Sequence, residues 1–216
     1  MNLARLLQLA SPTLPVGAYS YSGGLEAAIE DGIVSDAASA ERWIGDVLQF
    51  SVARMEASIL FSFIHSFKQK NSNEYQELNE RFLASRESAE LRAETVQMGY
   101  SLNRLLKDLN AGEVPVEEPS FPAAYAYAAA QWKIEPEAAL LAYLWAWLEN
   151  QVMAAVKAVP LGQTDGQRIL LSLGGLLPSL AAKAKNMTEQ DLGNFAPGLA
   201  MLSARHETQY SRLFRS

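Results

Sequence analysis

Apolar residues recur at helical spacing through most of the chain. Leu102, Leu105, Leu106 and Leu109 follow the i, i+3, i+4, i+7 spacing of one helix face. Steps of three and four also separate the apolar residues between Trp43 and Phe67. The sequence has no convincing run of alternating β-branched residues. The pattern therefore predicts an all-α fold, a single-domain helical bundle of about eight to ten helices over residues 1–216.

Proline and glycine mark the expected helix ends. We expect helices near 2–10, 24–31, 36–67, 73–84, 86–109, 121–131, 136–157, 164–184 and 195–213. The clearest break is the stretch 110–122, which is either a linker between domains or a long surface loop within one bundle. The second interpretation is favoured because neither half looks able to close a core of its own.

The segment that follows Pro136 is apolar nearly all round, which is typical of a helix at the centre of a bundle. Glu149, Asn150 and Gln151 interrupt it. A buried carboxylate needs partners. These three residues therefore either reach a neighbouring backbone or solvent, or they line a polar pocket or a partner contact.

Composition narrows the classes of function. The chain has 216 residues, no cysteine and a net charge of −6. Thiolate chemistry and disulfides are excluded, and the acidic balance disfavours nucleic acid as a partner. The longest apolar run, Ala138–Leu148, is shorter than the roughly 18 residues of a membrane span, and the N-terminus does not read as a signal peptide. We expect a cytoplasmic protein without a membrane contact.

Enzyme motifs are missing from the sequence. It contains neither a P-loop nor a G-x-S-x-G elbow. His206 and Glu207 begin an H-E-x-x-H pattern, but Tyr210 occupies the place of the second histidine. The one other histidine, His65, is expected to be packed or solvent-tipped, so a closed transition-metal site within one chain is hard to build. A metal site shared across a dimer stays open. The alternative to a non-enzyme is a small helical enzyme with a polar pocket near Glu149–Gln151.

The first of three distinctive segments is Ser11–Gly32. Pro12, Pro15 and Gly17 predict a turn-rich path into a helix that starts near Gly24. Two tyrosines in this stiff loop suit recognition, since tyrosine adds contact area at low entropic cost. The alternative is a hydrophobic staple that locks the first helix down.

The second segment is Ala158–Leu173, in which Pro160 ends one helix and Thr164 or Asp165 can cap the next. Gln163 and Gln167 stand four apart near that helix start. They form either a hydrogen-bonding corner for a partner or an ordinary turn between helices.

The third segment is the ending, from Arg205. If it is helical to Leu213, Arg205, Gln209 and Arg212 line up beside a stripe of His206, Tyr210 and Leu213. This pattern predicts an amphipathic helix with a basic face. Such a helix packs on its own bundle or enters a groove of another protein.

These three segments, "LPVGAYSYSGGLE", "VPLGQTDGQ" and "RHETQYSRLFRS", together resemble the UreF family of urease accessory proteins. The stretches "SRESAELRAETVQMGYSL", "FPAAYAYAAAQW" and "AYLWAWLENQVMAAVK" are similar to its middle, so the resemblance covers essentially the whole chain. The chain begins almost on the first motif, without the longer N-terminal extension of some members. Any contact made by such an extension is therefore not carried over.

The resemblance implies an all-α homodimer that takes part in nickel insertion into urease and performs no chemical step. Its implied partners are a UreD/UreH-type scaffold protein, which docks on the urease apoprotein, and a UreG-type GTPase, which brings nickel. It implies no stably bound cofactor; nickel passing through the complex would leave no motif in the sequence.

The resemblance also assigns residues to partner surfaces. The scaffold-facing candidates are Arg205, His206, Glu207, Gln209, Tyr210, Arg212, Leu213 and Phe214. The candidates for the GTPase-facing or dimer surface are Pro15, Gly17, Tyr19, Ser20, Gly24, Leu25 and Glu26. A further partner corner comprises Gly162, Gln163 and Gln167. Regulation of the GTPase is expected to work by positioning, and the rarer alternative is an inserted arginine, for which the candidates are Arg42, Arg54, Arg92 and Arg168.

Overall fold

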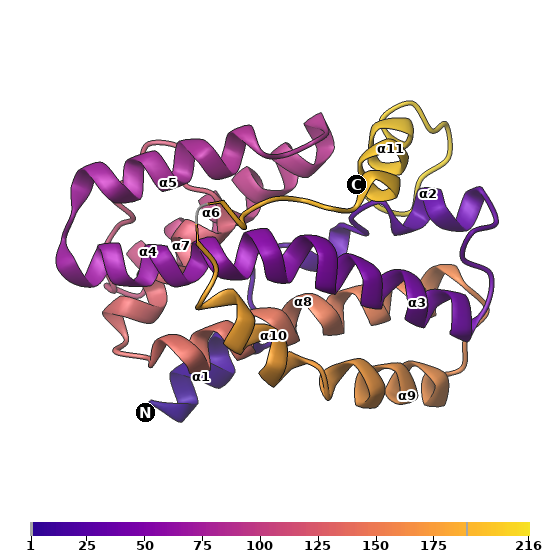
Figure 1. Ribbon diagram of the computed structural model, residues 1–216, viewed down its shortest axis with the longest axis horizontal. Helices are drawn as coiled ribbons and strands as arrows, with labels where there is room; N and C mark the ends of the chain where they lie inside the picture. Colours follow the sequence, from indigo (N-terminus) through magenta and orange to yellow (C-terminus); the bar gives the residue numbers. More distant parts are fainter. Residues whose placement is uncertain (1, 189) are drawn as a thin grey trace.

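The computed structural model describes residues 2–188 and 190–216, and these residues form an all-α bundle (Figure 1). They hold ten helices when α3, η2 and α4 are counted as one continuous helix, which confirms the prediction of eight to ten. In chain order the elements are α1 (Leu3–Ala10), η1 (Ala18–Ser20), α2 (Leu25–Glu30), α3 (Ala37–Val47), η2 (Leu48–Ala57), α4 (Ser58–Gln69), α5 (Ser72–Ala84), α6 (Ala89–Asp108), α7 (Phe121–Gln131), α8 (Pro136–Ala158), α9 (Gln163–Gly174), α10 (Leu177–Ala184) and α11 (Pro197–His206).

The longest helix runs from Ala37 to Gln69 and forms one axis of the molecule. Asp36 begins it with a capping box to Ser39, and Lys70 ends it in the left-handed region at φ 56°. Its middle, η2, is a π-helix, which the sequence did not indicate. By length and composition this helix alone, among the described residues, could cross a membrane. Because 67% of its most apolar window is buried in the bundle, it has the character of a core helix.

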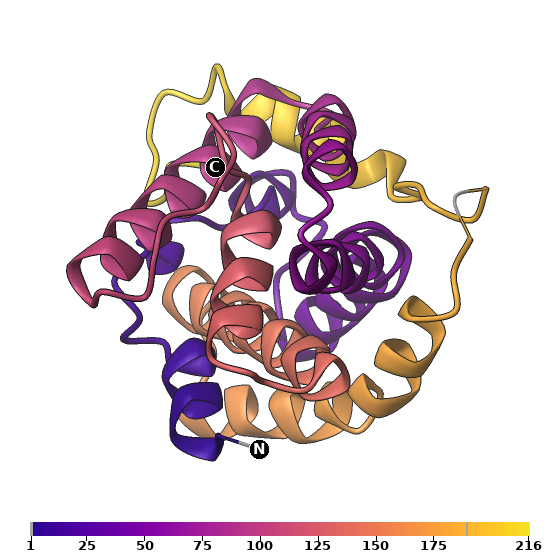
Figure 2. The same ribbon diagram turned by 90° about the vertical axis from the view of Figure 1, so that its left-hand side faces the viewer.

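The second central helix is α8. It packs against α1, α2, α3, α4, η2, α7, α9 and α10, as expected for a helix that is apolar nearly all round. Figure 2 looks along the long axis and shows α9 and α10 curving around one side of the bundle, with α5 and α6 on the other. Residues from before and after the 110–120 loop share one hydrophobic core. The loop packs onto the bundle through Val114 and Val116, which favours the surface-loop interpretation.

Two helix predictions are wrong. The expected helix 164–184 is two helices, because the chain turns at Gly175 and Leu176 and α10 begins again with Pro178 in its first turn. The expected helix 195–213 ends at His206. The residues after His206 make hydrogen bonds with distant parts of the chain in place of a helical ladder.

Candidate functional site

The tail, residues 207–216, folds back from α11 onto α2 and α6 (Figure 1). It joins two of the three distinctive segments of the sequence. The backbone amide of Arg215 donates to the carbonyl of Ser20 at 2.8 Å, and the amide of Ser22 donates to the backbone oxygen of Ser216 at 2.8 Å. The Ser22 hydroxyl donates to the same oxygen. The first and last segments therefore form one site.

Glu26 is the centre of this site. It lies in the first turn of α2 and is only 8% exposed. Its carboxylate accepts hydrogen bonds from two successive tail amides, Leu213 at 2.7 Å and Phe214 at 2.9 Å. Helix α2 can start here because Gly24 takes a left-handed conformation at φ 79°, where a side chain would also press on Leu199. The glycine thus lets α2 approach α11 closely enough for Glu26 to reach the tail.

His206, the last residue of α11, is fully buried between two carboxylates. Its Nε2 lies 3.2 Å from Glu26 and its Nδ1 lies 2.6 Å from Glu90. Both ring nitrogens therefore lie within hydrogen-bond distance of a carboxylate oxygen. The guanidinium of Arg212 lies 2.7 Å from the other oxygen of Glu90. The His206 ring thus links the two glutamates, and Arg212 adds a cation beside Glu90.

Glu94 ends the row of acidic side chains on this face of α6. It accepts a hydrogen bond of 2.8 Å from the hydroxyl of Ser216. Burial raises its pKa from the ordinary 4.5 to about 7, although the Ser216 hydrogen bond works in the opposite direction. This carboxyl is therefore neutral over much of the acidic pH range.

The tail residues divide into inward and outward groups. His206 and Phe214 are buried, and Arg212 is half-buried in its ion pair. Glu207 accepts from the amide of Ala89, Gln209 donates to Glu30, and Arg205 pairs with Asp31 at 2.5 Å. Tyr210 is fully exposed and Leu213 is 73% exposed. The predicted helical stripes do not exist; the outward face is instead set by the fold of the tail.

The 11–24 loop likewise combines both interpretations of its sequence. Tyr21, Gly24 and Leu25 are buried, so part of the segment packs into the bundle. Tyr19 is 67% exposed, and Pro15 is exposed beside the partly buried Gly17 and Ser20. Tyr19 is therefore the exposed aromatic side chain of the loop, and Pro12, Thr13 and Pro15 are exposed with it.

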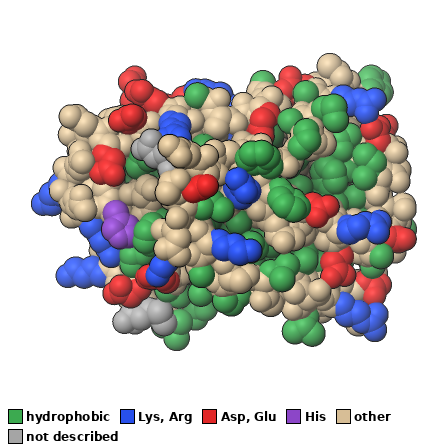
Figure 3. Space-filling model, viewed as in Figure 1, with side chains coloured by type: hydrophobic (Ala, Val, Ile, Leu, Met, Phe, Trp, Pro, Cys, Tyr) green, Lys and Arg blue, Asp and Glu red, His purple; other side chains and the backbone are tan. Residues whose placement is uncertain are grey.

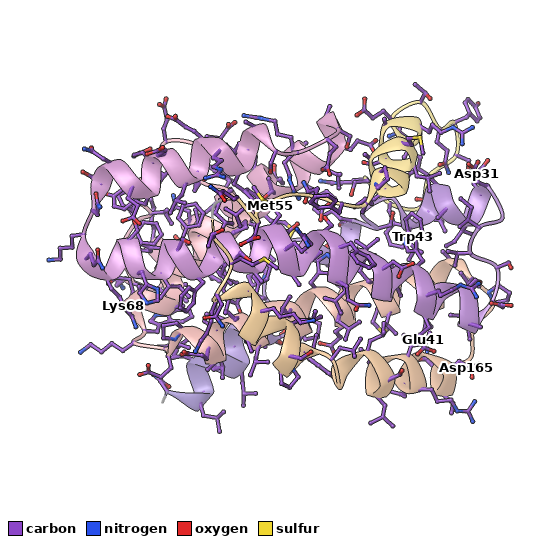
Figure 4. The ribbon with its side chains drawn as sticks, viewed as in Figure 1. Asp31, Glu41, Trp43, Met55, Lys68 and Asp165 are labelled. Carbon is purple, nitrogen blue, oxygen red and sulfur yellow. The ribbon has the colours of Figure 1, made fainter. Side chains whose placement is uncertain are left out.

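The α8–α9 corner comprises residues 159–168, and among the described residues no hydrogen bond joins it to the tail. Gly162, and neither Thr164 nor Asp165, stands at the helix start, so that capping prediction is wrong. Gln163 and Gln167 are exposed. Figure 4 shows Asp31 at the end of α2 and Asp165 on α9 at the same end of the long axis, on either side of Glu41 and Trp43 of α3. Because Arg205 pairs with Asp31, the end of α11 lies at the same end of the molecule as the corner.

A cavity of 270 Å³ lies between the 11–23 loop, η2, α6 and α8. Glu149, Asn150 and Gln151 all line it, and Asn150 also donates to the carbonyl of Tyr21 at 3.2 Å. The two interpretations of these residues therefore both hold in part. The π-helix contributes Ser51, Val52 and Glu56, since its wider turn brings residues four and five apart onto one face, and Val47 at the end of α3 adds to them.

The polar end of the cavity was not foreseen from the sequence. Arg86, 5% exposed, pairs with Glu56 at 2.9 Å, and the Tyr143 hydroxyl donates to the second oxygen of Glu56 at 2.6 Å. Burial raises the pKa of Tyr143 well above its ordinary value. The one available signal was Glu56 itself, an acidic residue within a long apolar helix.

One face of the molecule carries an exposed apolar patch. Figure 3 shows apolar side chains gathered between α3 and α11 on the face of Figure 1, where charges of both signs are otherwise mixed. Met201 of α11 is 64% exposed. His65 is exposed and rests on the Phe61 ring. Within the part of the chain that is described, no group of three metal-binding side chains occurs.

Comparison with known proteins identifies the family. A family model for UreF matches residues 34–174. The chain is 58% identical to the urease accessory protein UreF of Azoarcus sp. (strain BH72), with 100% of this chain and 96% of that protein covered. It is 55% identical to the protein of that name from Dechloromonas aromatica (strain RCB), with 100% and 98% covered. It is also 47% identical to a bifunctional urease accessory protein UreEF of Bordetella bronchiseptica, with 100% of this chain and 52% of that protein covered. The chain belongs to the UreF family of urease accessory proteins.

Proposed function

We propose that this chain is a non-enzymatic adaptor that bridges a UreD/UreH-type scaffold protein and a UreG-type GTPase while nickel is delivered to the urease apoprotein. It acts in the cytoplasm as a homodimer. Membership of the family supports the role in urease maturation. The fused relative from Bordetella supports work beside other accessory proteins, because one chain there carries both names.

The observation that carries the adaptor proposal is the outward face of α11 and the tail. Met201, Tyr210 and Leu213 present large side chains to solvent from a segment that is fixed by buried hydrogen bonds. Exposed apolar and aromatic side chains on an ordered segment are typical of an interface. We assign the scaffold contact to this face. The buried members of the earlier list, His206 and Phe214, would support it from below.

The experiment is binding of the scaffold protein, measured by size-exclusion chromatography with light scattering. Leu213→Asp and Tyr210→Ala should abolish or strongly weaken the complex while the chain stays folded. Leu171→Asp is the matched control, since Leu171 of α9 is 82% exposed and far from the tail in sequence. Point variants are preferable to truncation after Ser203, which would also remove His206 from between Glu26 and Glu90. Unchanged binding by Leu213→Asp and Tyr210→Ala would overturn the assignment. The same measurement gives the mass of the chain alone, where a monomer would contradict the homodimer.

For the GTPase we propose contact with the loop tip at Tyr19 and with the α8–α9 corner. The adaptor acts by binding one nucleotide state of the GTPase more tightly than the other, since a ligand shifts an equilibrium only by that difference. Arg168 is 74% exposed and stands in this corner, 2.9 Å from Asp165, whereas Arg54 stacks on Phe195 and Arg92 pairs with Glu118. Single-turnover GTP hydrolysis with Arg42, Arg54, Arg92 and Arg168 each changed to alanine separates the two mechanisms. A large loss of the hydrolysis rate with one variant supports an arginine finger. An unchanged rate with all four variants supports the positioning mechanism.

A second candidate is a small-molecule site in the cavity, the feature that a helical enzyme would need. Its support is that the cavity is lined both by Glu94, whose pKa is raised to about 7, and by the Glu56–Arg86 pair. The relatives argue for the adaptor, since they carry accessory-protein names. A thermal-shift screen of small polar ligands, repeated with Glu94→Gln, tests it. A hit that this variant abolishes would favour the cavity function.

A further inference from the structure

The cavity between the 11–23 loop, η2, α6 and α8 has both an exposed side and a buried end. Pro12, Tyr19 and Lys157 line it and are exposed, so the cavity reaches the surface beside the loop. Tyr143 and Arg86 also line it, and both side chains are almost fully buried. We call the buried end the base of the cavity; it comprises Glu56, Arg86, Glu94, Phe121 and Tyr143.

The charges that line the cavity are not balanced. Three are glutamates and two are cations, which leaves one negative charge when all are ionised: Glu56, Glu94, Glu149, Arg86 and Lys157. Within the base, Arg86 is already paired with one oxygen of Glu56 at 2.9 Å. The Tyr143 hydroxyl donates to the other oxygen at 2.6 Å. Both oxygens of Glu56 are therefore occupied, and Glu94 is the carboxyl group left for an occupant.

Glu94 keeps one oxygen free. Its Oε2 accepts the hydroxyl of Ser216 at 2.8 Å. Its Oε1 accepts no hydrogen bond from the described part of the chain and is not sealed from open space. Because Glu94 lines the cavity, this oxygen is available to an N–H or O–H donor inside it.

Aromatic rings surround the same end of the cavity. The Phe121 and Tyr143 rings lie 5.7 Å apart at 33°, and Trp147, one turn after Tyr143 on α8, lines the cavity with them. Aromatic faces beside a carboxylate are the combination that recognises organic ammonium ions. A bare metal ion fits less well, since no group of three metal-binding side chains occurs among the described residues.

We propose that the cavity binds a primary ammonium ion carried on a short aliphatic chain. The ammonium group donates to Glu94 and lies against the Phe121 and Tyr143 rings, while the aliphatic chain lies along apolar walls that include Leu9 and Met98. This inference rests on the second candidate function, a small-molecule site in the cavity, and it names the ligand class of that site. It is independent of the adaptor role.

The pKa of Glu94 makes the binding depend on pH. Burial raises that pKa to about 7, so about a tenth of the carboxyl groups are ionised at pH 6 and about nine-tenths at pH 8. An alkylammonium ion resembles lysine, with a pKa of about 10.4, and stays charged throughout. Affinity should therefore rise about tenfold from pH 6 to pH 8. The groups that face Glu94 are Tyr21 of the loop, Glu56 of η2, Arg86, Glu90 of α6, Tyr143 of α8 and Ser216 of the tail.

The test is a titration of the full chain with n-pentylammonium chloride, followed by NMR of ¹³C-labelled methionine methyl groups. Met98 and Met153 line the cavity, whereas Met55 and Met201 do not, so the chain carries its own internal control. The signals of the first pair should shift saturably and those of the second should not. The neutral isostere 1-pentanol should bind at least about tenfold more weakly, and pentanoate and potassium chloride should have no effect.

Variants separate the ligand class from the cavity itself. At pH 8, Glu94→Gln should weaken n-pentylammonium binding to the level of 1-pentanol and abolish its pH dependence. Ala146→Leu, which fills part of the cavity, should weaken binding of both compounds, and the exposed Glu80→Gln should change nothing. Urea unfolding confirms that each variant is folded.

Two results would overturn the proposal in different ways. Equal binding of n-pentylammonium and 1-pentanol, or binding that survives Glu94→Gln, would leave a ligand cavity but refute the ammonium class. Unmoved signals of Met98 and Met153 with every compound would remove the cavity function as well. Because no partner protein is present in these titrations, neither result bears on the adaptor proposal.

Discussion

Glu26 and Phe214 stand 188 positions apart, and the Glu26 carboxylate accepts a hydrogen bond of 2.9 Å from the Phe214 amide. One residue belongs to the first conspicuous segment of the sequence and the other to the last. A short polar contact therefore unites segments that looked like independent surfaces. It also explains why the tail is not a helix: its amides have a better acceptor in a buried carboxylate.

The environment of His206 predicts an asymmetry between the two histidines. His206→Leu removes the ring whose two nitrogens lie within hydrogen-bond distance of Glu26 and Glu90. Leaving these buried carboxyl groups without that partner should lower the free energy of unfolding by about 3 kcal/mol. His65→Leu, at an exposed position, should change it by less than about 0.5 kcal/mol. Urea unfolding followed by circular dichroism measures both variants, and equal effects would contradict the buried cluster.

Gly24 and Gly198 should respond oppositely to alanine. Gly24 has φ 79°, and a Cβ there would lie 3.0 Å from Leu199, so Gly24→Ala should cost about 1–2 kcal/mol of stability. Gly198 lies in α11 with open space around it, so Gly198→Ala should add about 0.4–1 kcal/mol. Both glycines adjoin α11, which makes them a matched pair for thermal unfolding. A stabilising Gly24→Ala would show that α2 does not start as described.

Local sequence signals predicted most of the helices, because their causes are local. Ser88, Ser120 and Asn71 cap the helices that follow them, and the apolar periodicity placed α6 and α8 within a few residues. The helix predicted for the tail was wrong because the tail's conformation depends on Glu26 and Glu90, which lie far away in the sequence. The spacing of Arg205, Gln209 and Arg212 fitted a helix, but spacing along the chain carries no information about a hydrogen-bond acceptor that is distant in sequence. The Glu56–Arg86 pair escaped prediction for the same reason.

The pair at the polar end of the cavity should be far more important to stability than a surface pair. Arg86→Met leaves Glu56 buried without its cation, and the expected loss is about 3–5 kcal/mol. Arg92→Met breaks the half-exposed pair with Glu118, for which a loss below about 1 kcal/mol is expected. Chemical denaturation of the two variants gives the comparison directly. Similar losses would mean that the Glu56–Arg86 pair is accessible to water.

The raised pKa of Glu94 predicts a specific pH dependence. Between pH 4.5 and about 7 the folded chain keeps a proton that the unfolded chain has lost. The contribution of Glu94 to stability is therefore fully present below pH 4.5, falls as the pH rises through this window and is level above it. Glu94→Gln cannot titrate, so the variant should gain stability relative to the wild type as the pH goes from 5 to 8.

Urea unfolding of wild type and Glu94→Gln at several pH values in that window measures this difference. The exposed Glu80→Gln variant serves as the control and should track the wild type. A constant difference between Glu94→Gln and wild type across the window would rule out a proton held by Glu94.

The hydrogen bond between Ser22 and Ser216 spans 194 positions, and this separation has a consequence for synthesis. A chain grows from its N-terminus and folds progressively as it emerges. Helices α2 and α6 are made long before residue 212, so Glu26 and Glu90 lack their partners in residues 212–216 while the intervening chain is synthesised. The outward face that carries Leu213 forms only after more than 200 residues have been made. A partner that recognises this face would bind chains that extend through Leu213 and pass over those interrupted before it.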